Sequence, residues 1–195
     1  MVENGRFTPS LVAKAQAIRL LLTDVDGVLT DGGVYYSAAG EEMKRFSIRD
    51  GLGVERLRQL TGIEVGIVTG EASPSVLRRA EKLKITELHL GIRHKKAVLA
   101  DIFGRLKLQP KEIAYIGDDA NDLEVMRHVG LSATPADGYR EVLVMADYVC
   151  QSPGGHGAFR EFVELLIAAR REPVPDEVEG VAAVNGSAVN GRVAI

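Results

Sequence analysis

Short apolar runs alternate along the chain with longer stretches in which apolar and polar residues mix. The run Arg19-Leu20-Leu21-Leu22-Thr23 is too apolar to alternate, which fits a central strand covered by helices on both faces. Further strands are predicted at 64–68, 87–90, 113–116, 131–133 and 148–149. Helices are predicted at 9–18, 52–60, 74–83, 95–106, 119–129, 139–145 and 158–169. Strands that alternate with helices predict an α/β fold with a doubly wound parallel sheet.

One segment after the first strand does not follow this alternation. Gly40-Glu41-Glu42 lies between the strand-like stretches 34–36 and 43–46. A polar, glycine-containing interval between two such stretches is typical of a β-hairpin. We therefore expect an exposed hairpin between the first strand and the helix that follows.

The length and the local composition of the chain predict one domain and a C-terminal tail. A chain of 195 residues can bury one substantial core and is too short for two ordinary domains, so residues 1–172 are predicted to form a single domain. Residues 173–195 contain a small near-repeat with little bulk to bury, which predicts a flexible C-terminal tail. The only cysteine, Cys150, lies in an apolar run and is predicted to be a buried thiol rather than a nucleophile.

The charge distribution disfavours nucleic acid and membranes as partners. The formal net charge is −3, and no basic cluster suggests a phosphate-backbone footprint. The longest apolar stretches, such as 17–25, contain charged residues and cannot span a bilayer. The first ten residues lack the pattern of a secretory signal, so we expect a cytoplasmic protein.

Polar residues follow four of the predicted apolar runs. Ligands of open parallel sheets gather at the carboxyl ends of the strands, so these positions are the candidate site. They comprise Asp24-Val25-Asp26-Gly27, Thr69-Gly70-Glu71, Lys95 at a helix start, and Gly117-Asp118-Asp119-Ala120-Asn121-Asp122. Their order at successive strand ends predicts one shared site.

The residue types at these positions suit phosphoryl transfer. Of the paired carboxylates Asp24 and Asp26, one can attack phosphorus while the other donates a proton to the leaving oxygen. Acids so close together repel unless a cation lies among them, and hard oxygen ligands beside phosphate favour Mg²⁺, with Asp118 as a third ligand. Thr69, the N–H of Gly70 and Lys95 would stabilise the charge of the phosphoryl oxygens.

Each motif also has a structural interpretation when it is taken alone. Asp-Gly pairs are common turn signals, and Asp118-Asp119 could cap the helix that follows. Thr69-Gly70 could serve only loop geometry, and a lone Lys95 is more often solvated than bound to phosphate. A structural role does not predict that all four occur in this order, which favours the catalytic interpretation.

The motif Asp24-Val25-Asp26-Gly27-Val28-Leu29 resembles the signature Asp-x-Asp-x-[Val/Thr]-[Leu/Val] of the haloacid dehalogenase superfamily. The resemblance implies that Asp24 is a nucleophile that forms an aspartyl-phosphate. It implies that Asp26 is an acid/base residue whose backbone carbonyl binds Mg²⁺. The resemblance also implies that Thr69 and Lys95 are catalytic residues and that Asp118 binds the metal. Asp119 and Asp122 would support the metal site without binding the metal directly.

Further segments resemble one capless branch of that superfamily, which hydrolyses phosphates of 3-deoxy-2-keto sugar acids. They are 24–33, 40–42, 49–51 and 154–161. In agreement with this branch, no insertion large enough for a cap domain separates Leu29 from Thr69 or Thr69 from Lys95. The resemblance implies a homotetramer in which the hairpin of one subunit helps to close the site of a neighbour.

The same resemblance suggests the substrate contacts. Candidates are Gly70, Arg49, Asp50, Gly51, Glu71, Arg79 and Lys82, with Arg160 as a further candidate anion contact. The substrate would be 3-deoxy-D-manno-octulosonate 8-phosphate or a nine-carbon relative, KDN 9-phosphate or N-acylneuraminate 9-phosphate. Enzymes for the eight-carbon substrate typically carry Arg where this chain has Glu71, so Glu71 with Lys82 favours a nine-carbon substrate.

Other functions fit the sequence less well. One alternative is a non-catalytic tetrameric interaction domain related to the C-terminal domain of sialic-acid cytidylyltransferases. Such a domain would be expected to have lost the catalytic residues, and they are all present here. A response-regulator-like receiver lacks the Asp-x-Asp spacing. Phosphomutases and phosphonatases normally carry a cap domain.

Overall fold

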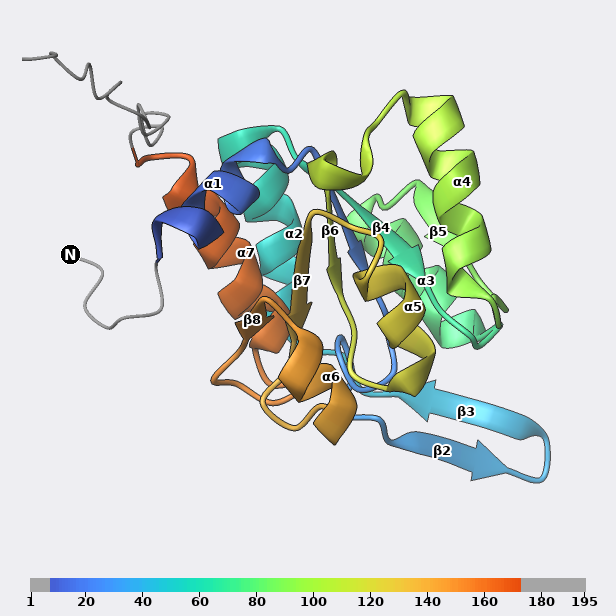
Figure 1. The fold of residues 1–195 in the computed structure, drawn as a ribbon. Coiled ribbons are helices and arrows are strands. Elements are labelled where there is room, and N and C mark those ends of the chain that lie inside the picture. Colours follow the sequence, from blue (N-terminus) through green and yellow to red (C-terminus); the bar gives the residue numbers. More distant parts are fainter. Residues whose placement is uncertain (1–7, 173–195) are drawn as a thin grey trace, which may run out of the picture.

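The computed structural model describes residues 8–172, and its centre is one sheet of parallel strands (Figure 1). The sheet consists of β1 (Leu20–Thr23), β4 (Glu64–Val68), β5 (Glu87–His89), β6 (Ile113–Ile116), β7 (Leu131–Thr134) and β8 (Tyr148–Val149). The strand order is β5-β4-β1-β6-β7-β8, and every neighbouring pair is parallel. The chain therefore runs outward from β1 in both directions, and the predicted doubly wound α/β class is confirmed.

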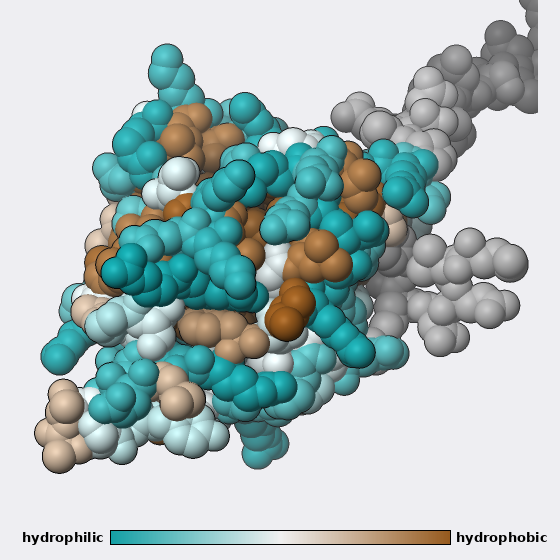
Figure 2. All heavy atoms as spheres, turned by 180° about the vertical axis from the view of Figure 1, so that it is seen from behind, coloured by the Kyte–Doolittle hydropathy of each residue, from teal (hydrophilic) through white to brown (hydrophobic). Residues whose placement is uncertain are grey.

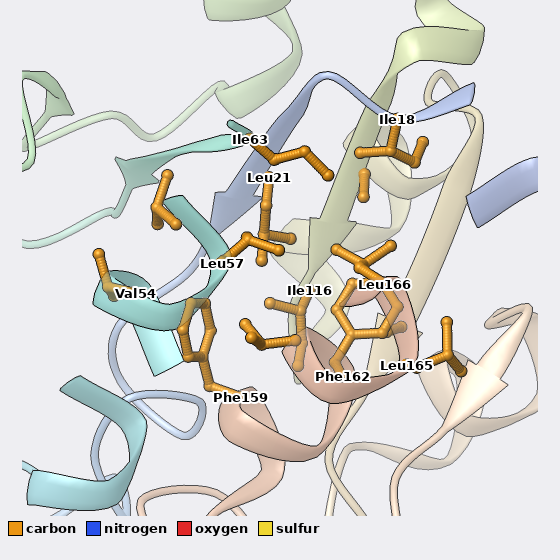
Figure 3. Packing of buried hydrophobic residues seen from close by; sticks show 14 of the residues in the cluster. Ile18, Leu21, Val54, Leu57, Ile63, Ile116, Phe159, Phe162, Leu165 and Leu166 are labelled. Atoms are coloured by element: carbon orange, nitrogen blue, oxygen red, sulfur yellow. The ribbon is translucent and has the colours of Figure 1, made fainter. Parts of the chain in front are cut away.

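Helices cover both faces of the sheet. One face packs against α1 (Pro9–Ala17), α2 (Ile48–Thr61), α3 (Pro74–Leu83) and α7 (Ala158–Ala169), and the other against α4 (Lys95–Leu106), α5 (Leu123–Met126) and α6 (Arg140–Met145). Successive residues of β1 alternate between these layers, because Leu21 belongs to the first core and Leu20 and Leu22 to the second. Figure 3 shows Leu21 and Ile116 of the sheet among side chains of α2 and α7.

The helix starts follow capping signals in the sequence. Thr8 accepts the N–H of Leu11 at the start of α1, where Pro9 is the first helical residue. Ser47 caps α2 in the same way, so this helix begins at Ile48, four residues earlier than predicted. At its other end, Gly62 adopts the left-handed conformation, with φ 72°, that often terminates helices.

The prediction of one continuous helix over residues 119–129 is wrong. A 3₁₀ turn (Ala120–Asp122) leads into the short α5, which ends at Met126. The carboxylate of Asp122 accepts the backbone N–H groups of Asp118 and Asp119, which tightens this turn. The segment is therefore shaped by the side chain of Asp122 rather than by an uninterrupted helix.

The hairpin forms as predicted, but its turn lies elsewhere. β2 (Val34–Ser37) pairs antiparallel with β3 (Gly40–Lys44), so the segment 40–42 belongs to the second strand and the turn consists of 38–39. Figure 1 shows the pair standing apart from the parallel sheet. Between Leu29 and Lys95 the chain forms only this hairpin, α2, β4, α3 and β5, and none of them is a cap domain.

The remaining surface and core features agree with an ordinary globular protein. Hydrophilic residues cover most of the face in Figure 2, with hydrophobic residues in separate areas between them. Cys150 is buried, as predicted. Within residues 8–172 no helix combines the length and the apolar character that crossing a membrane requires. The predicted tail 173–195 lies outside the described residues, so its flexibility stays a prediction.

Candidate active site

Three strand-end loops meet beside β1. Asp24, Thr69 and Asp118 follow β1, β4 and β6, which are neighbours in the sheet. The N–H of Asp24 donates to the carbonyl of Ile116 at 3.0 Å, which ties the first loop to the end of β6. Asp24 and Thr69 are 5% and 1% exposed, so they lie at the base of the site. The parallel topology thus brings together residues that are far apart in sequence.

Lys95 joins two of these carboxylates from the first turn of α4. Its Nζ lies 3.0 Å from Oδ1 of Asp24 and 2.7 Å from Oδ1 of Asp122. The side chain is fully buried, so the ammonium is balanced by these acids rather than by water. Burial lowers the pKa of Lys95, but the carboxylates of Asp24 and Asp122 outweigh it and raise the pKa overall. Lys95 is therefore a fixed positive charge beside Asp24.

Asp122 is held by four donors and holds the site together. Oδ1 accepts Lys95 and the hydroxyl of Tyr115, the latter at 2.6 Å. Oδ2 accepts the N–H groups of Asp118 and Asp119 at 3.0 and 3.2 Å. Both oxygens of this buried carboxylate are thus occupied, which fits a supporting role behind the metal ligands. Tyr115 was not among the predicted site residues, although a tyrosine in a buried strand has a hydroxyl that needs a hydrogen-bond partner.

The surroundings of Asp24 and Asp118 disfavour the charged form of both carboxyl groups. Burial raises the pKa of Asp24, the charge of Asp122 adds to the rise, and Lys95 opposes it, so that the pKa is about 7. Burial and the charges of Asp24 and Asp122 raise the pKa of Asp118 to about 8. Mutual repulsion of this kind is typical of acids arranged to bind a cation or to face a reacting group.

The donor set fits a hard divalent cation. Carboxylate oxygens of Asp24, Asp118 and Asp122 lie within 4.8 Å of one another. Oδ1 of Asp118 is buried and accepts no hydrogen bond, and the buried Oδ1 of Asp24 is paired with the ammonium of Lys95 at 3.0 Å. Oxygen ligands on a carboxylate-rich site are those that Mg²⁺ prefers. Asp24 and Asp118 could therefore hold Mg²⁺, with Asp122 fixing the loop that carries Asp118.

Close backbone packing shapes the loop after β1. Gly27 has φ 86°, and a Cβ at this position would lie 2.0 Å from Oδ2 of Asp118. A Cβ at Gly154 would lie 1.8 Å from the carbonyl oxygen of Gly27. The N–H of Gly155 donates to the carbonyl of Val28 at 2.9 Å. The segment 154–157 therefore packs directly against the loop after β1, and this approach requires glycine.

Asp26 does not point its carboxylate into the acidic cluster. Both of its oxygens accept hydrogen bonds from Nζ of Lys44, at 2.6 and 2.7 Å. Of the groups of Asp26, its backbone carbonyl remains the candidate for the predicted metal contact. Lys44 was not among the predicted site residues, since nothing in the local pattern 40–44 shows that this lysine turns inward.

The comparisons with known proteins agree with this geometry. The family model of the haloacid dehalogenase-like hydrolases matches residues 91–161. The chain is 42% identical over 176 residues to the 3-deoxy-D-manno-octulosonate 8-phosphate phosphatase KdsC of Escherichia coli K12, covering 90% of this chain and 92% of the relative. The chain belongs to the haloacid dehalogenase-like hydrolases. The predicted family and its enzyme class, a hydrolase, are thereby confirmed.

Solved structures of this family share the fold. The phosphatase of the same name from Moraxella catarrhalis, solved with a magnesium ion, phosphate and KDO, superposes with a TM-score of 0.81 at 36% identity, covering 85% of this chain and 94% of that one. A structure from Vibrio cholerae, described as a 3-deoxy-D-manno-octulosonate 8-phosphate phosphatase, also has a TM-score of 0.81, at 42% identity over 85% and 92% of the two chains. The acids of this family member can hold the predicted Mg²⁺.

Three residues that were predicted to contact the substrate make close contacts within the protein itself. Oδ1 of Asp50 accepts the N–H of Arg160 at 2.9 Å, at the start of α7. Arg79 donates to the carbonyl of Ser47 at 2.7 Å, and its guanidinium lies 5.5 Å from the ring centroid of Phe46. A Cβ on Gly51 would lie 2.3 Å from Nη2 of Arg79. These contacts join the base of the hairpin to α2, α3 and α7.

The other predicted contacts lie on the surface. Arg49 and Glu71 are exposed, and Gly70 is half-buried beside them on the loop after β4. Lys82 is also exposed, and with Glu55 and Arg58 it lines a recess between α2 and α3. The ion pairs formed within residues 8–172 do not include a Glu71–Lys82 pair, so the structure does not join these two residues. Their roles in substrate binding stay predictions.

Proposed function

We propose that the chain is a Mg²⁺-dependent phosphatase that hydrolyses 3-deoxy-D-manno-octulosonate 8-phosphate through an aspartyl-phosphate on Asp24. The observation that carries this proposal is the arrangement of Asp24 itself. Its Oδ1 is buried and is paired with the ammonium of Lys95 at 3.0 Å. A carboxylate placed in this way is ready to attack an electrophile whose negative charge Lys95 attracts.

The residues of the chain divide the reaction between them. Asp24 attacks phosphorus, and Asp26, protonated on one oxygen while the other stays bonded to Lys44, donates that proton to the sugar oxygen as the phosphorus–oxygen bond to it breaks. Thr69 and Lys95 stabilise the negative charge of the phosphoryl oxygens. Asp26 then accepts a proton from the water that hydrolyses the aspartyl-phosphate, and Asp24 is released. Mg²⁺ held by Asp24 and Asp118 would screen the charge of the phosphate.

The relatives support the eight-carbon substrate. The curated relative from Escherichia coli and the Moraxella structure both carry the octulosonate name. The prediction of a nine-carbon substrate depends on an exposed Glu71 carboxylate that faces the substrate, and among residues 8–172 this side chain forms no ion pair, so its role in substrate choice stays a prediction. We therefore place 3-deoxy-D-manno-octulosonate 8-phosphate first and keep the nine-carbon phosphates as comparison substrates.

The proposed assembly is a homotetramer. Four large apolar side chains on the hairpin and the start of α2 are more than half exposed: Tyr35 (60%), Tyr36 (71%), Met43 (57%) and Ile48 (84%). Apolar surface gathered on one projecting element supports burial against another subunit. In the capless branch such a contact would replace the missing cap as the means of excluding water. Sedimentation of the purified protein tests this assembly.

Phosphate release by the purified protein tests the function. With Mg²⁺, the octulosonate 8-phosphate should be hydrolysed faster than KDN and N-acetylneuraminate 9-phosphates, and EDTA should abolish the release. Asp24→Asn should be inactive, because the amide cannot attack phosphorus. Acid-quenched wild-type protein should carry phosphate that hydroxylamine removes, the behaviour of an acyl phosphate. A lack of release from all three substrates would favour the non-catalytic alternative.

A further inference from the structure

Lys44 is the most deeply buried charge of the hairpin. It lies at the end of β3, and its side chain is 1% exposed. Its ammonium contacts both oxygens of Asp26, at 2.6 and 2.7 Å, while the side chain of Asp26 is 26% exposed. A buried ammonium needs such a partner, because an unpaired charge in this place is strongly unfavourable. The pair therefore fixes the direction of the Asp26 carboxylate.

The same strand is anchored at a second point of the site. Glu41 of β3 accepts a hydrogen bond from the hydroxyl of Ser73 at 2.5 Å. Ser73 is buried and caps α3, directly after the loop that carries Thr69 and Gly70. β3 thus contacts the loops after two strands of the sheet. Lys44 binds Asp26 on the loop after β1, and Glu41 binds Ser73 at the end of the loop after β4.

We propose that Lys44 is a positioning residue that holds the acid/base carboxylate of Asp26 in place for proton transfer. This inference rests on the proposed function, since only there does Asp26 have a proton to deliver. Lys44 itself transfers no proton. Through Lys44 the hairpin sets where Asp26 lies relative to the oxygen that leaves phosphorus, and a small displacement of a catalytic group is enough to slow a reaction strongly.

The dependence of the rate on the leaving group distinguishes this role from general support of the fold. The alkoxide that leaves octulosonate 8-phosphate is strongly basic, so it needs the proton of Asp26 as the bond breaks. The 4-nitrophenolate ion that leaves 4-nitrophenyl phosphate is stable without a proton. A misplaced Asp26 should therefore impair the first substrate much more than the second.

The test compares kcat/KM of Lys44→Met for both substrates, because kcat/KM reports the steps up to the first phosphoryl transfer. We expect a loss of roughly tenfold to hundredfold with octulosonate 8-phosphate and less than about threefold with 4-nitrophenyl phosphate. In the Asp26→Asn background, Lys44→Met should cause no further loss with the sugar substrate. Lys44→Gln replaces the Met variant if thermal melting shows that the latter does not fold.

Arg45→Met is the matched control. Arg45 is the next residue, its side chain is 51% exposed, and its ion pair at 3.2 Å is with Asp31 instead of Asp26. This variant should keep the wild-type ratio of the two kcat/KM values. Equal losses of Lys44→Met with both substrates, or a further loss in the Asp26→Asn background, would overturn the role of Lys44. Failure of the wild-type protein to hydrolyse any sugar phosphate would instead refute the proposed function.

Discussion

Asp122→Asn tests whether one buried carboxylate holds the site together. The substitution keeps the shape of the side chain but turns one of its two oxygens into an NH₂ group. That group must face either Lys95 and the hydroxyl of Tyr115, or the N–H groups of Asp118 and Asp119. In both orientations donors confront donors, and the charge that balances Lys95 is lost.

The expected cost follows from these contacts. Removing one partner of a buried ion pair typically costs about 3–5 kcal/mol. Lys95 keeps Asp24 at 3.0 Å, so we expect the lower end, about 3 kcal/mol. Tyr115→Phe removes a single donor from an oxygen that still accepts Lys95 at 2.7 Å, so its cost should be about 1.5 kcal/mol.

Urea unfolding at pH 7 in EDTA measures both variants without the contribution of bound metal. The free energy of unfolding should fall about twice as far for Asp122→Asn as for Tyr115→Phe. Far-UV circular dichroism before unfolding checks that each variant is folded. If Asp122→Asn costs no more than Tyr115→Phe, then Asp122 does not act as the buried charge that this reasoning requires, and its role is limited to one hydrogen bond.

Three further predictions follow from the packing and the charges. Gly154→Ala places a Cβ 1.8 Å from the carbonyl oxygen of Gly27, so the catalytic loop must shift and kcat/KM for the sugar phosphate should fall on the order of 100-fold; an unchanged value would show that the loop yields freely. Gly104→Ala in α4 meets no atom within 4 Å and should raise the free energy of unfolding by about 1 kcal/mol in urea titrations, and a decrease would contradict the open space around it. Burial raises the pKa of Asp147, but hydrogen bonds from Lys14 and the backbone of Ser132 lower it by more than burial raises it, so the pKa lies below its usual 3.8. The stability this group adds is therefore present above pH 3.8 and is lost as the pH falls through its lower pKa in the folded protein. The difference between the unfolding midpoints of wild type and Asp147→Asn should be greatest at neutral pH and should shrink as the pH falls below 3.8, and a difference that does not shrink there would refute the assignment.

The positions of the site could be predicted because they depend on local patterns. The apolar run before Asp24 signals a buried strand, and the parallel sheet then requires the residues after neighbouring strands to lie at one edge. The same reasoning placed Thr69 and Asp118 beside Asp24 without knowledge of any distance. Helix starts were predictable where a capping residue stands next to them, as at Thr8 and Pro9.

Features that depend on contacts across the chain were not predictable in this way. The segment 40–42 suggested a turn because it is polar and contains glycine, but pairing with β2 extends β3 to Gly40. The helix predicted from Asp119 onward is interrupted because the Asp122 side chain bonds back to the preceding loop. In both cases a partner outside the local window outweighs the local preference.

The pair of Asp26 and Lys44 shows why a catalytic motif is an incomplete description of a site. The motif specifies that a carboxylate stands two residues after the nucleophile, and the loop geometry allows that carboxylate several directions. The direction it takes depends on a lysine 18 positions later, at the end of a strand outside the parallel sheet. Residues 8–172 contain no cap domain, so under the proposed mechanism it is the hairpin, through Lys44, that orients the carboxylate of Asp26. Substitutions in β3 should therefore alter proton transfer as well as access to the site.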